Sequence, residues 1–142
     1  MPVEIKRAYE PPSVSDGKRV LVDRLWPRGL KRSDARIDAW LKELAPSHEL
    51  RRWFHERPQY FPAFRKRYLK ELASAAAGQE LEELYDLVRA NKAVTLLYAS
   101  KDQAHNNAVV LRDLLQGMRK PPSSSGPARA AAARVRARMP RR

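Results

Sequence analysis

The chain is predicted to be an α/β protein, with a small, mainly parallel sheet surrounded by helices and a disordered basic tail at its C-terminal end. Residues 20–22, within 19–23, and residues 94–98 are short apolar runs that contain β-branched residues, which is typical of buried strands. Between these runs, apolar residues recur at helical spacing. After residue 116 the composition changes to mainly Pro, Ser, Ala and Arg.

Two strands are predicted in the N-terminal part. Residues 3–7 alternate in polarity, which predicts a strand. Proline and glycine between positions 11 and 17 predict a loop. Residues 19–23 predict a short buried strand, and Pro27 and Gly29 predict an irregular turn after it.

Two helices are predicted in the next segment. Four apolar residues spaced i, i+3, i+4 and i+7 predict a short helix that ends before Pro46, namely Ile37, Trp40, Leu41 and Leu44. Ser47 is a good N-cap for a second helix, which carries the apolar residues Leu50, Trp53 and Phe54.

Two more helices, a strand and a last helix complete the prediction. The third helix begins near Pro58 and ends at Gly78, with an apolar stripe of Phe61, Phe64, Tyr68 and Leu72. The fourth carries Leu81, Leu84, Tyr85 and Val88. Residues 94–98 form the next strand, and a final helix runs from about Gln103 to Gln116, with Asp102 or Ser100 as its N-cap.

Composition excludes several classes of site. The chain of 142 residues contains no cysteine, so disulfides, zinc–thiolate sites and cysteine nucleophiles are excluded. The first residues lack the apolar region of a signal peptide, and no apolar run approaches the roughly 20 residues that span a bilayer. We expect a cytoplasmic protein without membrane contact.

The positive charge is concentrated at the C-terminal end. The formal net charge is +13, and residues 117–142 contain eight basic residues and no acidic one, which leaves +5 for residues 1–116. We therefore expect a single α/β domain over residues 1–116 and a disordered Pro/Ser-rich, then Ala/Arg-rich, tail over residues 117–142. Such a tail would bind nucleic acid weakly and without sequence preference.

Polar residues follow both buried strands. Asp23, Arg24 and Arg28 follow the first, and the second is followed by Lys101, Asp102, His105, Asn106 and Asn107. The carboxyl edge of a parallel sheet is where such groups meet a ligand. We therefore predict a binding or catalytic site for an anionic small molecule at this edge.

Each predicted site residue has an expected role. Arg24, Arg28 and Lys101 would bind the charge of the ligand, because arginine and lysine grip carboxylates and phosphates. Asp23 and His105 would be the catalytic acid–base pair, since histidine near a helix N-terminus tends to be neutral near pH 7. Asn106 and Asn107 would orient the ligand or the loop. No tight ligand spacing supports a metal site, and the sequence identifies no cofactor and no oligomeric state.

Other interpretations remain open. An Asp–Arg pair after a strand often only pins a loop, and Asn107, which falls within an apolar helical arc, can tie its helix to a neighbouring backbone. The alternative function is nucleic-acid association, in which the tail and the third helix, through Arg65, Lys66, Arg67 and Lys70, contact the phosphate backbone. A third reading is a partner-binding module with a purely structural polar cluster.

Several segments together resemble one known family. They are VLVDRLWPRGL at 20–30, WLKELAPS at 40–47, LRRWF at 50–54, LYASKD at 97–102 and HNNA at 105–108. The chain resembles, over about residues 2–116, the short, YeaO-like branch of the domain-of-unknown-function 488 family. The resemblance implies a compact α/β domain without an established reaction. Longer relatives carry a Cys-His-Arg group where this chain has His105, Asn106 and Asn107, so thiol chemistry is not available here. A methyltransferase label on some relatives is not supported, since a glycine-rich cofactor loop is absent.

Overall fold

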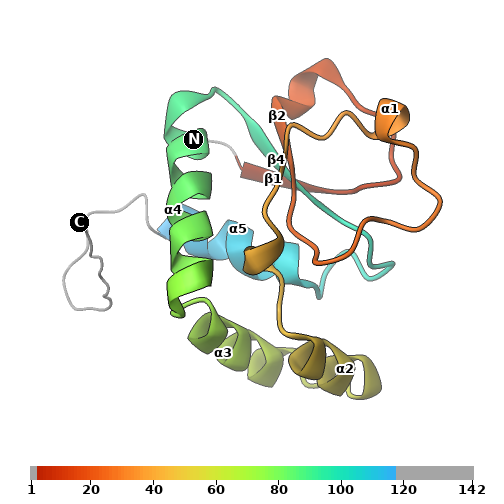
Figure 1. Ribbon diagram of the computed structural model, residues 1–142. Coiled ribbons are helices and arrows are strands. Elements are labelled where there is room, and N and C mark those ends of the chain that lie inside the picture. Colours follow the sequence, from red (N-terminus) through yellow and green to blue (C-terminus); the bar gives the residue numbers. More distant parts are fainter. Residues whose placement is uncertain (1–2, 118–142) are drawn as a thin grey trace.

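A four-stranded parallel sheet forms the centre of the molecule (Figure 1). The computed structural model describes residues 3–117. The strand order is β1-β4-β2-β3, with bounds β1 Val3–Arg7, β2 Lys18–Leu21, β3 Ala39–Trp40 and β4 Val94–Tyr98. The α helices are α1 Arg32–Ala35, α2 His48–Glu56, α3 Phe61–Glu71, α4 Ala75–Ala90 and α5 Asn107–Gly117, and two 3₁₀ turns are η1 Val14–Asp16 and η2 Lys42–Leu44. The predicted α/β class and parallel sheet are confirmed.

The two faces of the sheet are covered differently. Alternate residues of β4 point to opposite faces, so Val94, Leu96 and Tyr98 join the main core with apolar residues of α3, α4 and α5. Leu97 lies on the other face in a smaller cluster, against which Trp26 of a loop and Trp40 of β3 pack. Helices therefore pack mainly on one face, whereas loops and the short α1 cover the second (Figure 1).

The strand of residues 39–40 replaces a predicted helix. The prediction of a helix over Ile37–Leu44 was wrong, because residues 39–40 of this segment pair with β2 and extend the sheet. The N–H of Leu41 donates to the carbonyl oxygen of Leu21 at 2.9 Å. The indole N–H of Trp40 donates to the backbone carbonyl oxygen of Asp23 at 2.7 Å. These tertiary hydrogen bonds outweigh the local helical spacing.

Other boundaries shift by a few residues. The predicted strand 19–23 is Lys18–Leu21, although the N–H of Val22 still donates to Leu97 of β4. Ser47 caps α2 as predicted, accepting from the N–H of Leu50. The third helix ends at Glu71 instead of Gly78, because Ser74 caps α4 and places Gly78 inside that helix. The predicted basic tail lies outside the described residues.

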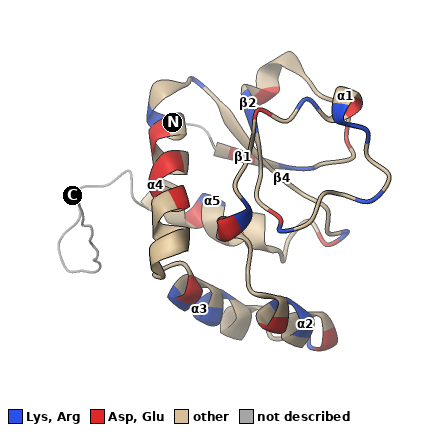
Figure 2. Cartoon of the chain, viewed as in Figure 1, with Lys and Arg blue, Asp and Glu red and all other residues tan. Residues whose placement is uncertain are grey.

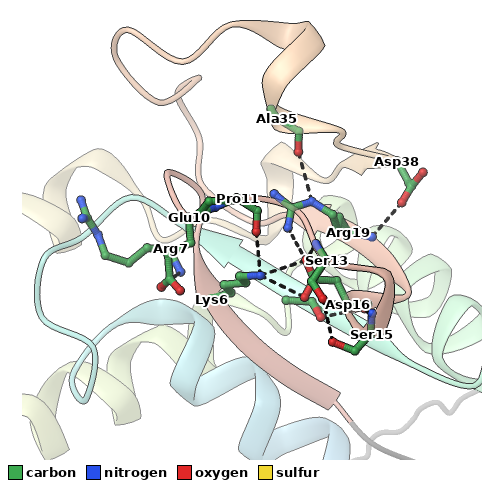
Figure 3. Close-up of polar contacts among 11 residues, drawn as sticks. Lys6, Arg7, Glu10, Pro11, Ser13, Ser15, Asp16, Arg19, Ala35 and Asp38 are labelled. Carbon is green, nitrogen blue, oxygen red and sulfur yellow. Dashed lines mark hydrogen bonds and ion pairs between the residues drawn. The ribbon is translucent and has the colours of Figure 1, made fainter.

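A buried ion cluster lies on the loop-covered face, centred on Asp16 (Figure 3). Oδ2 of Asp16 accepts from Nη1 of Arg19 at 2.6 Å and from the N–H of Ser13 at 2.9 Å. Nζ of Lys6 lies 3.1 Å from both carboxylate oxygens. Asp16 is 7% exposed and Arg19 is 3% exposed, so the cluster ties β1 and β2 together away from water.

Hydrogen bonding decides the ionisation of Asp16. Burial alone would raise the pKa of Asp16, but hydrogen bonds from Ser13, Lys6 and Arg19 outweigh it and lower the pKa below its usual value. The ion pairs therefore stabilise the fold when Asp16 is charged. Thr95 of β4 adds a further link, since its hydroxyl donates to the carbonyl oxygen of Asp16 at 2.7 Å.

Gly17, which follows the cluster, allows the chain to enter β2. Its φ is +65°, in the left-handed region that glycine tolerates. An added Cβ would lie 2.1 Å from the carbonyl oxygen of Ala93, the residue before β4. The N–H of Lys18 donates to that same oxygen at 3.1 Å.

Asp16→Asn is expected to lower the free energy of unfolding by about 3–5 kcal/mol at pH 7, because it leaves Arg19 buried without a carboxylate. The lowered pKa of Asp16 means that its contribution is present above the unfolded pKa of about 3.9 and is lost as the pH falls through the folded pKa. Urea unfolding of the wild type and of Asp16→Asn at several pH values measures the difference in the free energy of unfolding. Asp86→Asn, which breaks the exposed pair with Arg89, is the control and should cost at most about 1 kcal/mol. A difference between wild type and Asp16→Asn that does not shrink in acid would contradict the assignment.

Candidate functional site

Asp23 joins the two polar loops at the carboxyl edge of the sheet. β2 and β4 are paired, so the loops that follow them begin side by side. Oδ2 of Asp23 accepts from the N–H of Ala99 at 2.8 Å, and Oδ1 accepts from Nδ2 of Asn107 at 3.1 Å. The two loops are therefore joined through the carboxylate of Asp23.

The two asparagines serve the backbone. Asn107 is 9% exposed, and its Nδ2 also donates to the carbonyl oxygen of Val22 at 2.9 Å, which is the predicted tie between the helix and a neighbouring loop. Asn106 is buried, and its Oδ1 accepts from the N–H of Val109 at 3.0 Å. This bond caps the helix, so α5 begins at Asn107 and the predicted start near Gln103 was wrong.

His105 lies in a turn that Asp102 closes. Oδ1 of Asp102 accepts from the N–H groups of Ala104 and His105, both at 3.0 Å, and Oδ2 lies 3.2 Å from Nδ1 of His105. Asp102 thus closes this turn instead of capping the helix. The ring of His105 meets Phe61 edge-on at 5.0 Å and its side chain is 51% exposed. Burial alone would raise the pKa of Asp102, but these hydrogen bonds and the charge of His105 lower it.

The electrostatic environment of Asp23 was not predicted from the sequence. Burial raises the pKa of Asp23, and the hydrogen bonds from Ala99 and Asn107 and the charge of Arg51 only partly offset this. Arg51 lies on α2, far from Asp23 in the sequence. Nothing in the pattern of α2 distinguishes Arg51 from its basic neighbour.

Tyr68 is the second residue that the sequence analysis missed. It was read as part of the apolar stripe of the third helix, and it is fully buried. Its hydroxyl donates to the carbonyl oxygen of Leu44. Burial, followed by the charges of Asp23 and Glu71, raises the pKa of Tyr68 well above its usual value, and hydrogen bonding with Asn107 lowers it only slightly in comparison. A tyrosine at a buried stripe position is itself a signal, because its hydroxyl needs a partner.

The three predicted cations are placed differently from one another. Arg24 turns toward η2, where its Nη2 donates to the carbonyl oxygen of Ala45 at 3.3 Å and its Nη1 lies 3.9 Å from Glu43. Arg28 is exposed and contributes its backbone carbonyl to the hydroxyl of Tyr9. Lys101 is exposed. Neither arginine makes a direct hydrogen bond to the loop 101–107 among the described residues.

Arg24 is the predicted site residue that lines a cleft. The cleft has a volume of about 270 Å³ and is lined by Arg24, Glu43, Ala45, Ser47, Glu71, Leu72, Ser74 and Ala77. Glu71 is held by Ser47, whose N–H and hydroxyl donate to its two oxygens at 2.8 Å and 2.5 Å. Nε of Arg24 is buried and has no hydrogen-bond partner among the described residues. A buried donor left unpaired costs about 1–3 kcal/mol, so a small shift of the Arg24 side chain that brings Nε to an acceptor in the cleft would be favoured.

Neither a metal site nor a membrane span is found among residues 3–117. These residues contain no group of three or more His, Asp or Glu side chains placed to hold a metal ion. No helix in that range has the length and apolar character required to cross a membrane.

Asn107→Leu is expected to lower the free energy of unfolding by about 1–3 kcal/mol, because Val22 and Asp23 lose a buried hydrogen-bond donor. Thermal and urea unfolding measure the change. Gln103→Leu, at an exposed position before the same helix, is the control and should unfold like the wild type. A melt of Asn107→Leu that matches the control would show that the amide contributes nothing to stability.

Comparison with known proteins identifies relatives over most of the chain. The family described as the inactive DUF488-N3 subclade matches residues 2–130, which extends beyond Gly117, where the sequence analysis ended the resemblance. The uncharacterized protein YeaO of Escherichia coli K12 is 45% identical over 118 residues, which cover 83% of this chain and 100% of YeaO.

A mycobacterial relative also matches most of the chain. The uncharacterized protein Rv3073c of Mycobacterium tuberculosis H37Rv is 43% identical over 115 residues, covering 81% of this chain and 94% of that protein. No solved structure shows significant similarity to the chain. The family match and the identity to YeaO establish that the chain belongs to the DUF488 family, in the subclade described as inactive.

Proposed function

We propose that this protein binds a small molecule carrying a carboxylate or phosphate group, without converting it, in the cleft beside Arg24. The observation that carries the proposal is the buried Nε of Arg24, which has no partner among the described residues although its side chain lines the cleft. After a small shift of the side chain that opens Nε to the cleft, an anionic oxygen would satisfy this donor through a charge-assisted hydrogen bond. Ser74 also lines the cleft, and its hydroxyl, which accepts from the N–H of Ala77, can still donate its own proton.

The surroundings of Asp23 support binding without chemistry. Both of its carboxylate oxygens already accept hydrogen bonds that hold the loops together, from Ala99 and from Asn107. A general base needs a carboxylate that can reach a substrate proton. The chain also lacks a cysteine nucleophile, and the subclade to which it belongs is described as inactive. In this proposal Asp23 positions the loops, and His105 lines the edge of the sheet beside Phe61.

Arg24→Gln is expected to weaken binding of the anion about 10- to 100-fold, because a hydrogen bond to a charged group contributes about 1.5–3 kcal/mol. Ligands are found by mass spectrometry of molecules that co-purify with the protein, and by thermal shift with phosphate, pyrophosphate and dicarboxylates. Affinity is then measured by calorimetry.

Two control variants locate the site. Arg28→Gln removes an exposed cation near the same loop, and Arg89→Gln removes an arginine on α4 that pairs with Asp86. Both should bind like the wild type. Equal binding by Arg24→Gln, or an equal loss in either control, would refute a site at Arg24.

A second candidate function is nonspecific association with nucleic acid through residues 117–142. The observation in its favour is the eight basic residues of this segment, against +5 for the rest of the chain. The full chain is expected to bind duplex DNA weakly, with affinity that falls steeply as salt rises, and a chain ending at Gln116 should keep its cooperative melt but lose most of this binding. Tight, sequence-dependent binding by the shortened chain would place the interaction elsewhere.

A further inference from the structure

The helix pair α2 and α3 carries a net positive charge. Residues 48–71, which include both helices, contain seven Lys or Arg and three Glu, a net charge of +4. Figure 2 shows α2 and α3 together at one end of the molecule, away from the loops that cover the second sheet face. By contrast, α4 carries mainly acidic side chains in the same view (Figure 2).

Trp53 is the centre of an aromatic and basic cluster on this helix pair. The guanidinium carbon of Arg67 lies 4.1 Å from the centre of the Trp53 ring, and that of Arg57 lies 5.5 Å from it. Tyr60 stacks beside Trp53, with ring centres 6.4 Å apart and an interplanar angle of 27°. Tyr60 is 52% exposed, so part of this stack faces solvent. We call these residues and the adjoining lysines 66 and 70 the Trp53 surface.

Three cations of the Trp53 surface have no carboxylate partner among the described residues, namely Lys66, Arg67 and Lys70. Their neighbours are engaged, since Arg65 pairs with Asp113 at 2.9 Å and Arg57 with Glu56 at 3.3 Å. Arg67 and Lys70 are three residues apart on α3, so their side chains lie on the same side of the helix. Stacking on Trp53 holds the guanidinium of Arg67 in place while its N–H donors stay available.

We propose that the Trp53 surface binds single-stranded nucleic acid. Phosphate groups would pair with the three unpartnered cations, and an unstacked base would stack on the exposed ring of Tyr60. A duplex hides the faces of its bases within its own stack, so it offers only phosphates to this surface. The combination of exposed aromatic ring and unpaired cations therefore favours single strands, and it is independent of the Arg24 cleft and of residues 117–142.

The test uses the full chain and a fluorescently labelled single strand of about 12 nucleotides, with a duplex of equal length as the comparison. Fluorescence anisotropy over a range of salt concentrations gives affinity and salt slope. We expect tighter binding of the single strand. The double variant Arg67→Gln/Lys70→Gln should lower the salt slope by about 1.4, because two phosphate contacts are lost. Tyr60→Leu should weaken single-strand binding about tenfold, whereas Tyr60→Phe, which keeps the ring, should not.

The control Arg89→Gln/Lys92→Gln removes the same charge from the far end of α4 and from the turn after it. If this control lowered the affinity for the single strand as much as Arg67→Gln/Lys70→Gln does, the proposal would be overturned, because binding would then depend only on the net charge of the protein. Equal affinity for single strand and duplex, or equal effects of Tyr60→Leu and Tyr60→Phe, would exclude base stacking. Binding to phosphatidylserine vesicles without binding to the single strand would assign the surface to membranes instead.

Discussion

The buried carboxylate of Asp16 is the constraint on which the loop-covered half of the fold depends. Helices cover the other face of the sheet and exclude water with apolar side chains. Among residues 3–117, loops and the short α1 cover the second face, and charged side chains from β1 and β2 lie there. Asp16 and Arg19 are buried together and Lys6 pairs with them from a partly exposed position, since an unpaired buried charge costs several kcal/mol. The chain before β2 must therefore bring Asp16 between Lys6 and Arg19.

Arg19 of the ion cluster also holds the segment between α1 and β3. Nε of Arg19 donates to the carbonyl oxygen of Ala35 at 3.0 Å, and its backbone N–H donates to Asp38 at 2.8 Å. The ion cluster thus holds the segment that leads from α1 into β3 against the sheet (Figure 3). Asp23 plays a corresponding role at the carboxyl edge, where one carboxylate joins the loops after β2 and β4. Two aspartates, with pKa values shifted in opposite directions, organise the two polar regions of the molecule.

Much of the fold was predictable because it depends on local pattern. Strands β1 and β4, the cap at Ser47 and the buried amide of Asn107 follow from apolar pattern, capping chemistry and helical position. Trp40 was not predictable in this way, because its spacing suits a helix, and only its parallel pairing with Leu21 and the hydrogen bond from the N–H of Leu41 to Leu21 reveal a strand. The roles of Arg51 and Tyr68 depend on which elements pack against Asp23. The orientation of Arg24 depends likewise on the position of η2, which no local signal specifies.

Gly17 shows that exposure and tolerance to mutation are different properties. The residue is exposed, and a survey of surface positions would class it as freely variable. Yet its positive φ and the 2.1 Å approach to the carbonyl oxygen of Ala93 leave no room for a side chain. Any replacement would push the start of β2 away from β4, and Asp16, one residue earlier, would move with it. As a sequence of this kind drifts, an exposed glycine would therefore be among the last residues to change, while larger and more deeply buried side chains could exchange for others of similar volume.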